Sequence, residues 1–345
     1  MIENKINCAV IGCGHIGKRH AEMIMRNSRT QLVALCDVQP KENLNISNFP
    51  GNFYSDIQQL LSEESNIDVV HICTPNGLHA THANLALLAG KHVVIEKPMA
   101  LTVADCDSII ANAAIHNKSI FCVMQNRFSP PSVWLKNMIT ENRLGQIYMV
   151  QVNCFWNRDE RYYHKNTWHG KNDLDGGTLF TQFSHFIDTM VWLFGDIENI
   201  QTQFADFNHQ SLTDFEDSGN ITFSFKNGGI GSVHYSSAVY QQNFESSIRI
   251  IGEKGTIAIG GQYMNEVKYC HVENYAMPEL KPTAAPNNYG PYIGSAANHH
   301  FIIDNIVDVL DNNGAIATTA EEGKLVVSVI ERIYAQRPDY LLKNK

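Results

Sequence analysis

Clusters of positive charge are missing from this sequence. The chain has 345 residues, with 26 Lys and Arg against 35 Asp and Glu, and its formal net charge is −9. Proteins that bind nucleic acid or an anionic membrane surface concentrate Lys and Arg in a patch or stripe. Here the basic residues are scattered, so we expect no nucleic acid and no membrane among the partners.

Long apolar runs are missing too. Nothing in the chain approaches the ~20 consecutive apolar residues that a helix needs to cross a bilayer. The apolar run near the amino terminus, CAVIGCGHIG, reaches glycines too early for the core of a signal peptide. We therefore expect a soluble, cytoplasmic protein that is not exported.

Cysteine pairs with metal-binding or redox spacing are absent as well. The sequence has eight cysteines, no Cys-x-x-Cys pair and no regular cysteine spacing. Most of the cysteines lie in apolar, strand-like runs, where a reduced Cys behaves as a small hydrophobe. Asn298, His299 and His300 resemble metal ligands only at first sight, because adjacent residues at a helix start point in different directions. We predict no metal centre.

The first 124 residues alternate apolar runs with helical stretches. The runs INCAVI, QLVALC, DVVHIC, HVVI and SIFCV are apolar throughout rather than at every second position. Strands of this kind, joined by helices, are typical of a parallel sheet covered on both faces. Residues 1–124 are therefore predicted to form a doubly wound α/β domain.

Beyond residue 145 the pattern changes to short strand-like runs separated by tight turns. GNITFSF, GIGSVHYSSAV and SSIRIIGE alternate in polarity, and turn signals stand at 227–229 and 253–255. Two helical patterns, HHFIIDNIVDVLDNN and TAEEGKLVVSVIERIYAQ, close the chain. Residues 125–345 are predicted to form a second, α+β domain with a largely antiparallel open sheet.

A glycine-rich turn is predicted to hold a dinucleotide. GCGHIG follows an apolar run and opens a helix, the context in which backbone amides and a helix amino terminus bind a pyrophosphate. Asp37 ends the second strand, where a carboxylate accepts hydrogen bonds from ribose hydroxyls. Val38 and Gln39 follow, with no Arg to pair a 2′-phosphate, which favours NAD over NADP. The residues predicted to bind at this turn are Gly12, Gly14, His15, Ile16 and Gly17.

Polar residues also end two further strands of the first domain. Ligands of open α/β sheets bind at the carboxyl ends of the strands. A lysine at this edge can donate a hydrogen bond to an oxygen that is being oxidised or reduced. The alternatives are a turn that caps the next helix and a solvated lysine in a loop. The residues predicted to line the cofactor cleft are Thr74, Pro75, Asn76, His79, Glu96 and Lys97, with Pro98 ending the strand.

The order of these motifs resembles that of the Gfo/Idh/MocA family of NAD(P)-dependent oxidoreductases. GCGHIG, TPNGLHATHA, EKP, QNRF and DGGTLFTQFSHFID follow one another as in that family, and the resemblance covers essentially the whole chain. It implies a Rossmann first domain and a second domain whose open sheet face packs against another subunit. It also implies a carbohydrate substrate and a homodimer or homotetramer.

The resemblance further implies two catalytic residues. Lys97 becomes the substrate-contacting lysine, and His185 the base that removes the alcohol proton. From the residues alone, His185 on its apolar helix is better explained as a core histidine. Many members of the family place an Asp four residues earlier on the same helix face, where this chain has Thr181. That departure puts a carboxylate relay in question, and Thr181 or Gln182 is expected to contact substrate or ribose.

Further pocket residues are predicted on either side of these motifs. Gln125 and Arg127 follow the sixth strand, and Arg127 either binds an anionic substrate or pairs with Glu96. The segment before the helix of His185 is expected to reach across the substrate through Trp168, His169, Lys171 and Asp175.

The resemblance implies an NAD-dependent dehydrogenase or reductase acting on a hydroxyl or carbonyl of a sugar derivative. QNRFSPPSVWLKNMI, TQFSHFID and SAANHHFIIDNIVDVL are most similar to the branch that oxidises the 3-hydroxyl of UDP-N-acetylglucosamine derivatives or their uronates. Inositols, free sugars and sugar acids are alternative substrates. Two other possibilities are an NAD-dependent glycosidase that oxidises C3 transiently and a non-catalytic NAD-binding sensor.

Overall fold

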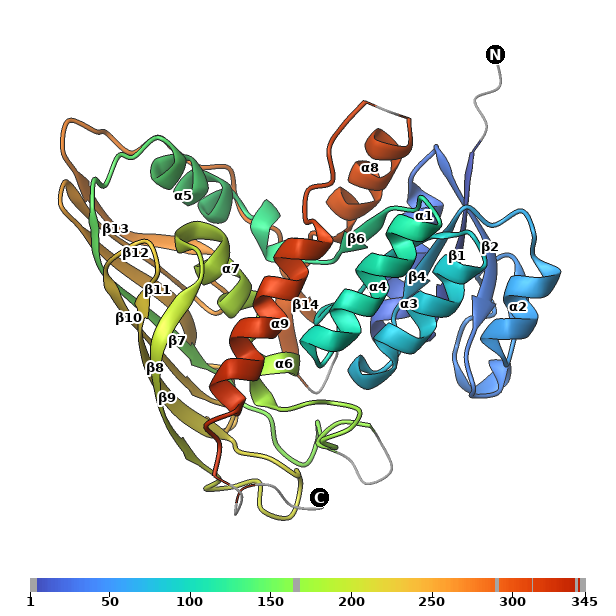
Figure 1. The fold of residues 1–345 in the computed structure, drawn as a ribbon, viewed down its shortest axis with the longest axis horizontal. Helices are drawn as coiled ribbons and strands as arrows, with labels where there is room; N and C mark the ends of the chain where they lie inside the picture. The colour runs from blue at the N-terminus through green and yellow to red at the C-terminus, as the bar shows by residue number, and fades with distance from the viewer. Residues whose placement is uncertain (1–4, 164–167, 289–291, 312, 339–340, 342–345) are drawn as a thin grey trace. The chain divides into compact units, whose positions relative to one another are not determined.

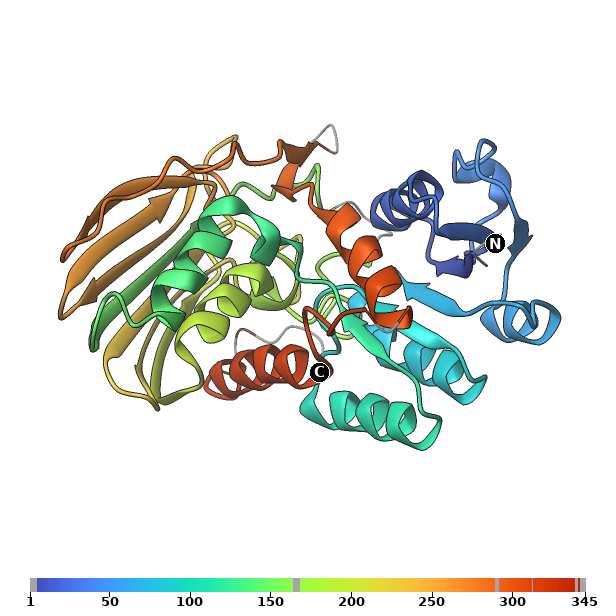
Figure 2. The same ribbon diagram turned by 90° about the horizontal axis from the view of Figure 1, so that it is seen from above.

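The chain forms two compact units (Figures 1 and 2). The computed structural model describes residues 5–163, 168–288, 292–311, 313–338 and 341. Unit 1 comprises Met1–Met124 and His299–Val327, and unit 2 comprises Gln125–Asn298 and Ser328–Lys345. The structure therefore divides the chain after Met124, but it adds His299–Val327 to the first unit, whereas the sequence pattern assigned that segment to the second domain.

Unit 1 is built on a six-stranded parallel sheet in the order β3-β2-β1-β4-β5-β6. This is the Rossmann strand order, and it confirms the predicted doubly wound domain. The central strands are almost wholly buried, as expected between two helical layers. The strands are β1 (Ile6–Ile11), β2 (Thr30–Cys36), β3 (Asn52–Tyr54), β4 (Val69–Ile72), β5 (His92–Ile95) and β6 (Ile120–Cys122).

Helices lie on both faces of this sheet, as Figure 2 shows. Two of them start at a side-chain cap: Asp56 accepts the N–H of Gln59 at 2.9 Å, and Thr102 accepts the N–H of Asp105 at 3.1 Å. The elements are α1 (His15–Arg26), η1 (Lys41–Asn43), α2 (Ile57–Glu63), η2 (Asn76–Leu78), α3 (His79–Leu88), α4 (Val103–Ile115), α8 (His299–Leu310) and α9 (Ala320–Tyr334), which ends in unit 2. Among the described residues no helix has the length and apolarity to cross a bilayer.

Unit 2 contains a seven-stranded sheet in the order β13-β12-β11-β7-β10-β9-β8. Only the β7–β10 pair is parallel, which confirms the predicted, largely antiparallel sheet. The strands are β7 (Ile147–Phe155), β8 (Ile197–Ala205), β9 (Ser218–Phe225), β10 (Ile230–Ser236), β11 (Glu245–Gly252), β12 (Gly255–Gly260) and β13 (Glu266–Val272). The remaining elements are η3 (Gln125–Phe128), α5 (Pro130–Thr140), α6 (Thr178–Thr181), α7 (Ser184–Phe194) and the ribbon of β14 (Pro286–Asn288) and β15 (Ile293–Ala296).

One face of the large sheet is covered and the other is open. Val233 and Tyr235 of β10 are buried, whereas Ser232 and His234 between them are only half-buried. Figure 1 shows α5 and α7 on the covered side. The register places Met149 beside both Ile230 and Ile251, and these three side chains are 44%, 52% and 45% exposed. The open face thus carries an apolar row across three neighbouring strands.

Candidate active site

The glycine-rich turn between β1 and α1 has the shape of a phosphate cradle. Gly12 has a φ of +89°, and a Cβ there would lie 2.6 Å from the carbonyl oxygen of Cys73. A Cβ on Gly17 would lie 1.8 Å from the carbonyl oxygen of Gly12, whereas one on Gly14 would meet nothing within 4 Å. Gly12 and Gly17 therefore allow tight packing, and the space at Gly14 lies at the helix amino terminus that starts with His15 and Ile16. A pyrophosphate fits this arrangement.

Asp37 is held against the same turn. One carboxylate oxygen, Oδ2, accepts the N–H of Cys13 at 2.7 Å, and Oδ1 accepts the N–H of Gln39 at 2.8 Å. An ionised carboxylate has about four acceptor sites, so two of them can still accept ribose hydroxyls. The cradle and the oriented carboxylate together fit an NAD molecule, which agrees with the sequence-based prediction.

His79 ties together the two loops that follow β4 and β5. Its Nδ1 lies 2.7 Å from the carbonyl oxygen of Pro98, and its Nε2 lies 2.9 Å from that of Thr74. Burial lowers the pKa of His79, although both carbonyls and the charge of Glu96 act in the opposite direction. The ring therefore fixes the carboxyl edge of the sheet, where Asn76 is also buried. A direct contact of His79, Asn76 or Pro75 with the cofactor stays a prediction.

Glu96 is a buried carboxylate at the end of β5. Its Oε1 lies 2.9 Å from Nε2 of His20 and 3.5 Å from Nε2 of His299, and its Oε2 accepts the backbone N–H of Lys97 at 3.1 Å. Burial alone would raise the pKa of Glu96, but the hydrogen bonds and positive potential of the two histidines hold it well below its usual value. His20 continues the network, because its Nδ1 lies 2.9 Å from Nδ1 of His71.

This histidine cluster also has the composition of a metal site. The ligand atoms of His20, Glu96 and His299 lie within 4.8 Å of one another. However, the 2.9 Å between His20 and Glu96 is a hydrogen-bond distance, shorter than the ~3.3 Å expected between two ligands of tetrahedral zinc. We therefore describe the cluster as a hydrogen-bond network. His299 is buried and His300 exposed, so the two neighbours do point in different directions.

Lys97 is half-buried directly after this carboxylate. It follows β5 at the carboxyl edge of the sheet, next to Glu96. This is the position that the sequence predicted for a lysine facing bound ligand.

The apolar helix predicted around His185 is in fact two helices. Thr181 is the last residue of α6, and His185 is the second residue of α7, with Gln182 and Phe183 between them. The expectation that positions 181 and 185 share one helix face is therefore wrong. His185 is buried, as is Thr181.

A carboxylate nevertheless lies beside Thr181. The Thr181 hydroxyl hydrogen-bonds Oδ1 of Asp175 and lies 3.0 Å from the backbone carbonyl oxygen of the same residue. The other carboxylate oxygen, Oδ2, accepts the N–H of Gly170 at 2.8 Å. Where many relatives have an Asp, this chain places a Thr and a separate, buried Asp. The sequence-based prediction named both residues but missed their pairing.

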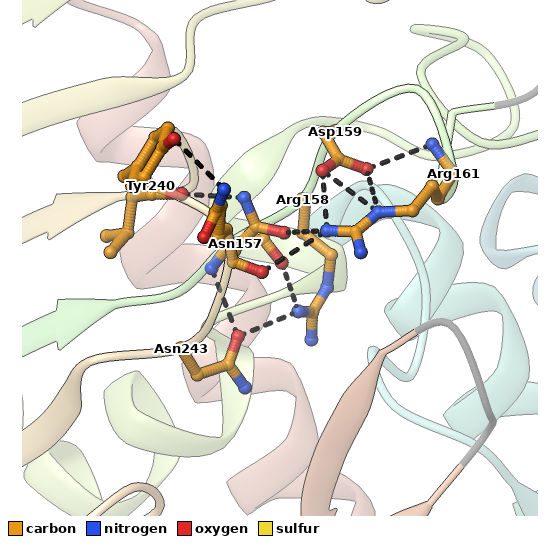
Figure 3. A network of polar contacts seen from close by, with 8 residues as sticks. Asn157, Arg158, Asp159, Arg161, Tyr240 and Asn243 are labelled. Carbon is orange, nitrogen blue, oxygen red and sulfur yellow. Dashed lines mark hydrogen bonds and ion pairs between the residues drawn. The ribbon is translucent and has the colours of Figure 1, made fainter.

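Arg158 is the centre of a second polar cluster in unit 2 that sequence reasoning missed (Figure 3). Its Nε donates to Oε1 of Gln182 at 2.7 Å, and Nη1 donates to the carbonyl oxygen of Asn157 at 2.6 Å and to Oδ1 of Asn243 at 3.1 Å. The buried guanidinium also lies over aromatic rings, at 4.9 Å from Trp156, 5.3 Å from Tyr162 and 5.1 Å from Tyr292. The run FWNRDERYY, with arginine between aromatic residues, was the available signal.

Arg127 pairs with Asp188, a partner that the sequence did not predict. The guanidinium donates from Nε to Oδ2 at 3.0 Å and from Nη2 to Oδ1 at 2.6 Å, and both residues are buried. Such a bidentate pair favours a structural role for Arg127, and a contact with substrate stays a prediction. Gln125 is buried as well, and its carbonyl oxygen accepts a hydrogen bond from Asn298 at 3.2 Å.

In the segment before α6, Trp168 and His169 stack at 4.1 Å, and Lys171 donates its N–H to the Trp168 carbonyl at 3.3 Å.

Unit 1 thus has the structure of a dinucleotide-binding domain with a lysine at its ligand edge, which is the arrangement of a nicotinamide-dependent oxidoreductase. Comparison with protein families gives the particular family. Residues 6–124 match the Gfo/Idh/MocA oxidoreductase family with NAD-binding Rossmann fold, and residues 133–258 match the Gfo/Idh/MocA C-terminal domain. The chain belongs to this family, as its motifs predicted.

Similar proteins have been described from several bacteria. The WlbA dehydrogenase from Bordetella pertussis, solved with NADH and UDP-GlcNAcA, is 30% identical with a TM-score of 0.86, and the similarity covers 99% of this chain and 100% of that one. A 1-carboxy-3-chloro-3,4-dihydroxycyclohexa-1,5-diene dehydrogenase from Comamonas testosteroni is 30% identical over 71% of this chain, although the match spans only 62% of the relative. An inositol 2-dehydrogenase from Salmonella typhimurium is 27% identical over 72% of each chain.

Proposed function

We propose that the protein is an NAD-dependent dehydrogenase that oxidises the 3-hydroxyl of a UDP-N-acetylhexosamine or its uronate. The main support is the similarity to the WlbA dehydrogenase that was solved with NADH and UDP-GlcNAcA, because it extends over 99% of this chain. The similarity to an inositol 2-dehydrogenase covers 72% of the chain at 27% identity and favours an inositol as the second candidate substrate.

The residues of unit 1 are suited to hold and orient the cofactor. The open side of Gly14 admits the pyrophosphate, and Asp37 accepts the ribose hydroxyls. Bound NAD supplies the hydride acceptor. Lys97 then donates a hydrogen bond to the oxygen that becomes a carbonyl, which stabilises the charge that develops there.

The residues of unit 2 take up the proton and bind the sugar. His185 is the base that accepts the hydroxyl proton, a role that suits the intrinsic pKa of imidazole. The Thr181 hydroxyl donates a hydrogen bond to Asp175, and a hydroxyl oxygen can also accept one from a substrate hydroxyl. Gln182, whose carbonyl oxygen accepts from Arg158, retains its amide donors for the same purpose.

The test is a substrate screen that follows NADH absorbance. UDP-N-acetylglucosamine, its uronate, myo-inositol, glucose and a sugar acid are each assayed with NAD and with NADP. We expect turnover with the sugar nucleotides and NAD, and a loss of at least about 100-fold in kcat for both Lys97→Met and His185→Ala. Lys118→Met is a matched control, because Lys118 precedes β6 at the opposite edge of the same sheet.

Four outcomes would contradict parts of the proposal. Turnover of inositol without turnover of sugar nucleotides would assign the second candidate substrate. Release of a sugar product without net NADH would indicate a glycosidase with transient oxidation. Tighter binding of NADP than NAD would refute the role given to Asp37. Full activity of both Lys97→Met and His185→Ala would refute the site itself.

The open face of the large sheet supports association with further copies of the chain. Met149, Ile230 and Ile251 form an exposed apolar row on this face. Burial of such a row between two copies is favourable, and we expect a homodimer or homotetramer. Sedimentation of the wild type and of Ile230→Glu would measure this, with the variant shifted toward monomer.

A further inference from the structure

Two buried histidines form hydrogen-bond contacts with the residues on either side of Lys97. On one side, His20 contacts the carboxylate of Glu96 at 2.9 Å, and that carboxylate accepts the backbone N–H of Lys97 at 3.1 Å. On the other side, His79 lies 2.7 Å from the carbonyl oxygen of Pro98. The backbone around Lys97 is therefore tied to α1 and to α3 rather than only to its own strand.

The chemistry of the carboxylate assigns the protons on the first side. A carboxylate can only accept, so Nε2 of His20 carries the proton of this hydrogen bond. In a neutral His20 ring the other nitrogen, Nδ1, then accepts from Nδ1 of His71 at 2.9 Å. His71 thus fixes the tautomer and orientation of His20, and His20 in turn fixes Glu96. The chain of contacts runs from the middle of β4 to the backbone of Lys97.

Burial makes this chain of contacts costly to break. His20, His71 and Glu96 are 1%, 0% and 5% exposed, and a buried carboxylate that loses its donor is left with an uncompensated charge.

Several titratable groups act on the network from neighbouring elements. They are Arg19 and His20 of α1, His71 of β4, Cys73 after β4, His79 of α3, Lys97 after β5 and His299 of α8.

We propose that His20 is a positioning residue for Lys97. Its hydrogen bond keeps the Glu96 carboxylate ionised and oriented toward the Lys97 N–H, which sets the place of the Lys97 ammonium at the carboxyl edge of the sheet. This inference rests on the proposed catalytic role of Lys97. His71 and His299 act on the same carboxylate, His71 through His20 and His299 from 3.5 Å.

The experiment compares two substitutions of His20 that differ in reach. His20→Leu removes the donor, whereas His20→Gln keeps an N–H donor of similar length. We expect His20→Leu to lower kcat by between about 10-fold and 100-fold, with little change in the KM for substrate or the Kd for NAD, and His20→Gln to restore most of the rate. Where His20→Leu does not fold, His20→Asn takes its place, because that amide is too short to reach Glu96.

Two further measurements separate positioning from a general loss of structure. In the Lys97→Met background, His20→Leu should lower the residual rate no further, because its effect passes through Lys97. Glu96→Gln should move the basic limb of the kcat–pH profile to lower pH, because the carboxylate favours a neighbouring ammonium. His92→Gln is the matched control: His92 begins β5, its Nδ1 accepts the N–H of Ser119 at 3.0 Å, and its loss should leave the profile in place.

The outcomes are distinguishable from failure of the proposed function. Full activity of Lys97→Met would refute the proposed function and this inference together. An inactive Lys97→Met with a fully active His20→Leu would refute only the inference. An equally low kcat for His20→Leu and His20→Gln, or one equivalent of a tightly bound transition metal in the purified protein, would also refute it.

Discussion

The two units bury carboxylates in different ways. In unit 1, Glu96 is contacted by the imidazoles of His20 and His299. In unit 2, Asp188 receives two hydrogen bonds from the guanidinium of Arg127. Imidazole changes charge between pH 5 and 8, whereas guanidinium stays charged. The charge of the buried polar network at the cofactor edge can therefore change with pH, whereas the charge of the Arg127–Asp188 pair does not.

A second pair in unit 2 follows the same rule. Glu216 accepts hydrogen bonds from Arg337 at 2.9 Å and from Tyr235 and Tyr334 at 2.8 Å each. These contacts join the segment before β9 to the end of α9 and the residues after it. For Asp188 and Glu216, the partners are thus arginine and tyrosine. Histidine surrounds the carboxylate that lies beside a proposed catalytic group.

The largest expected effect comes from breaking the arginine-bound pair. Asp188→Ala leaves the Arg127 guanidinium buried without this carboxylate. The loss should cost about 3–5 kcal/mol of the free energy of unfolding. Urea unfolding at pH 7.5 and pH 5.5 measures it, and the cost should be the same at both pH values because the guanidinium keeps its charge.

Tryptophan fluorescence gives this measurement a local probe. All four tryptophans, Trp134, Trp156, Trp168 and Trp192, belong to unit 2. Asp188→Ala should therefore shift the fluorescence transition to lower urea. Glu198→Ala on β8, whose side chain is exposed, is the matched control and should shift it little. A cost that grew or shrank strongly between the two pH values would contradict the contrast between the units.

The parts of unit 1 that the sequence predicted depend on local signals. The central strands are apolar at nearly every position because both faces of the sheet are covered. The turn of Gly12 and Gly17 is likewise a local property, because only glycine avoids the backbone contacts found there. The carboxyl ends of the strands then follow from the parallel order, which is why Lys97 was placed at the correct edge.

The contacts that the sequence did not reveal join residues far apart in the chain. His20 and Glu96 are 76 positions apart, and Arg127 and Asp188 are 61 apart, so no periodicity links them. The break between α6 and α7 was hidden because the residues on both sides of it are buried and the apolar pattern continues through Phe183. Buried polar partners are selected by the tertiary fold, and a single sequence carries little record of that choice.

A smaller effect should come from pH alone, and it should fall mainly on unit 1, although burial also lowers the pKa of His209 in unit 2. Burial is the main cause that lowers the pKa of His71, His79 and His299 in the folded chain. The folded state then binds fewer protons than the unfolded state, so this stability is present above the unfolded pKa of about 6.5 and is lost as pH falls below it. Each histidine that stays neutral contributes a slope of about 1.4 kcal/mol per pH unit.

Urea unfolding at pH 7.5, 6.5 and 5.5 measures this slope with two probes. Far-UV circular dichroism reports both units, and tryptophan fluorescence reports unit 2. We expect the circular dichroism transition to move to lower urea on acidification by more than the fluorescence transition does. His71→Asn should reduce that shift, since it removes one of the buried neutral rings. Equal shifts of the two probes would remove the distinction between the units.

The smallest expected effect comes from an ordinary polar contact at the surface of unit 1. Thr102 starts α4 by accepting the N–H of Asp105 at 3.1 Å. Thr102→Ala removes this cap and should cost about 1 kcal/mol of the free energy of unfolding, without pH dependence between 5.5 and 7.5 because a hydroxyl does not titrate there. Thr102→Ser keeps the acceptor and should retain most of that stability. The cost of Thr102→Ala in the free energy of unfolding is compared with the change of the wild type's free energy of unfolding over the same pH range. If the cost varied with pH as steeply as the wild-type stability does, the pH response of unit 1 would not come from its buried histidines.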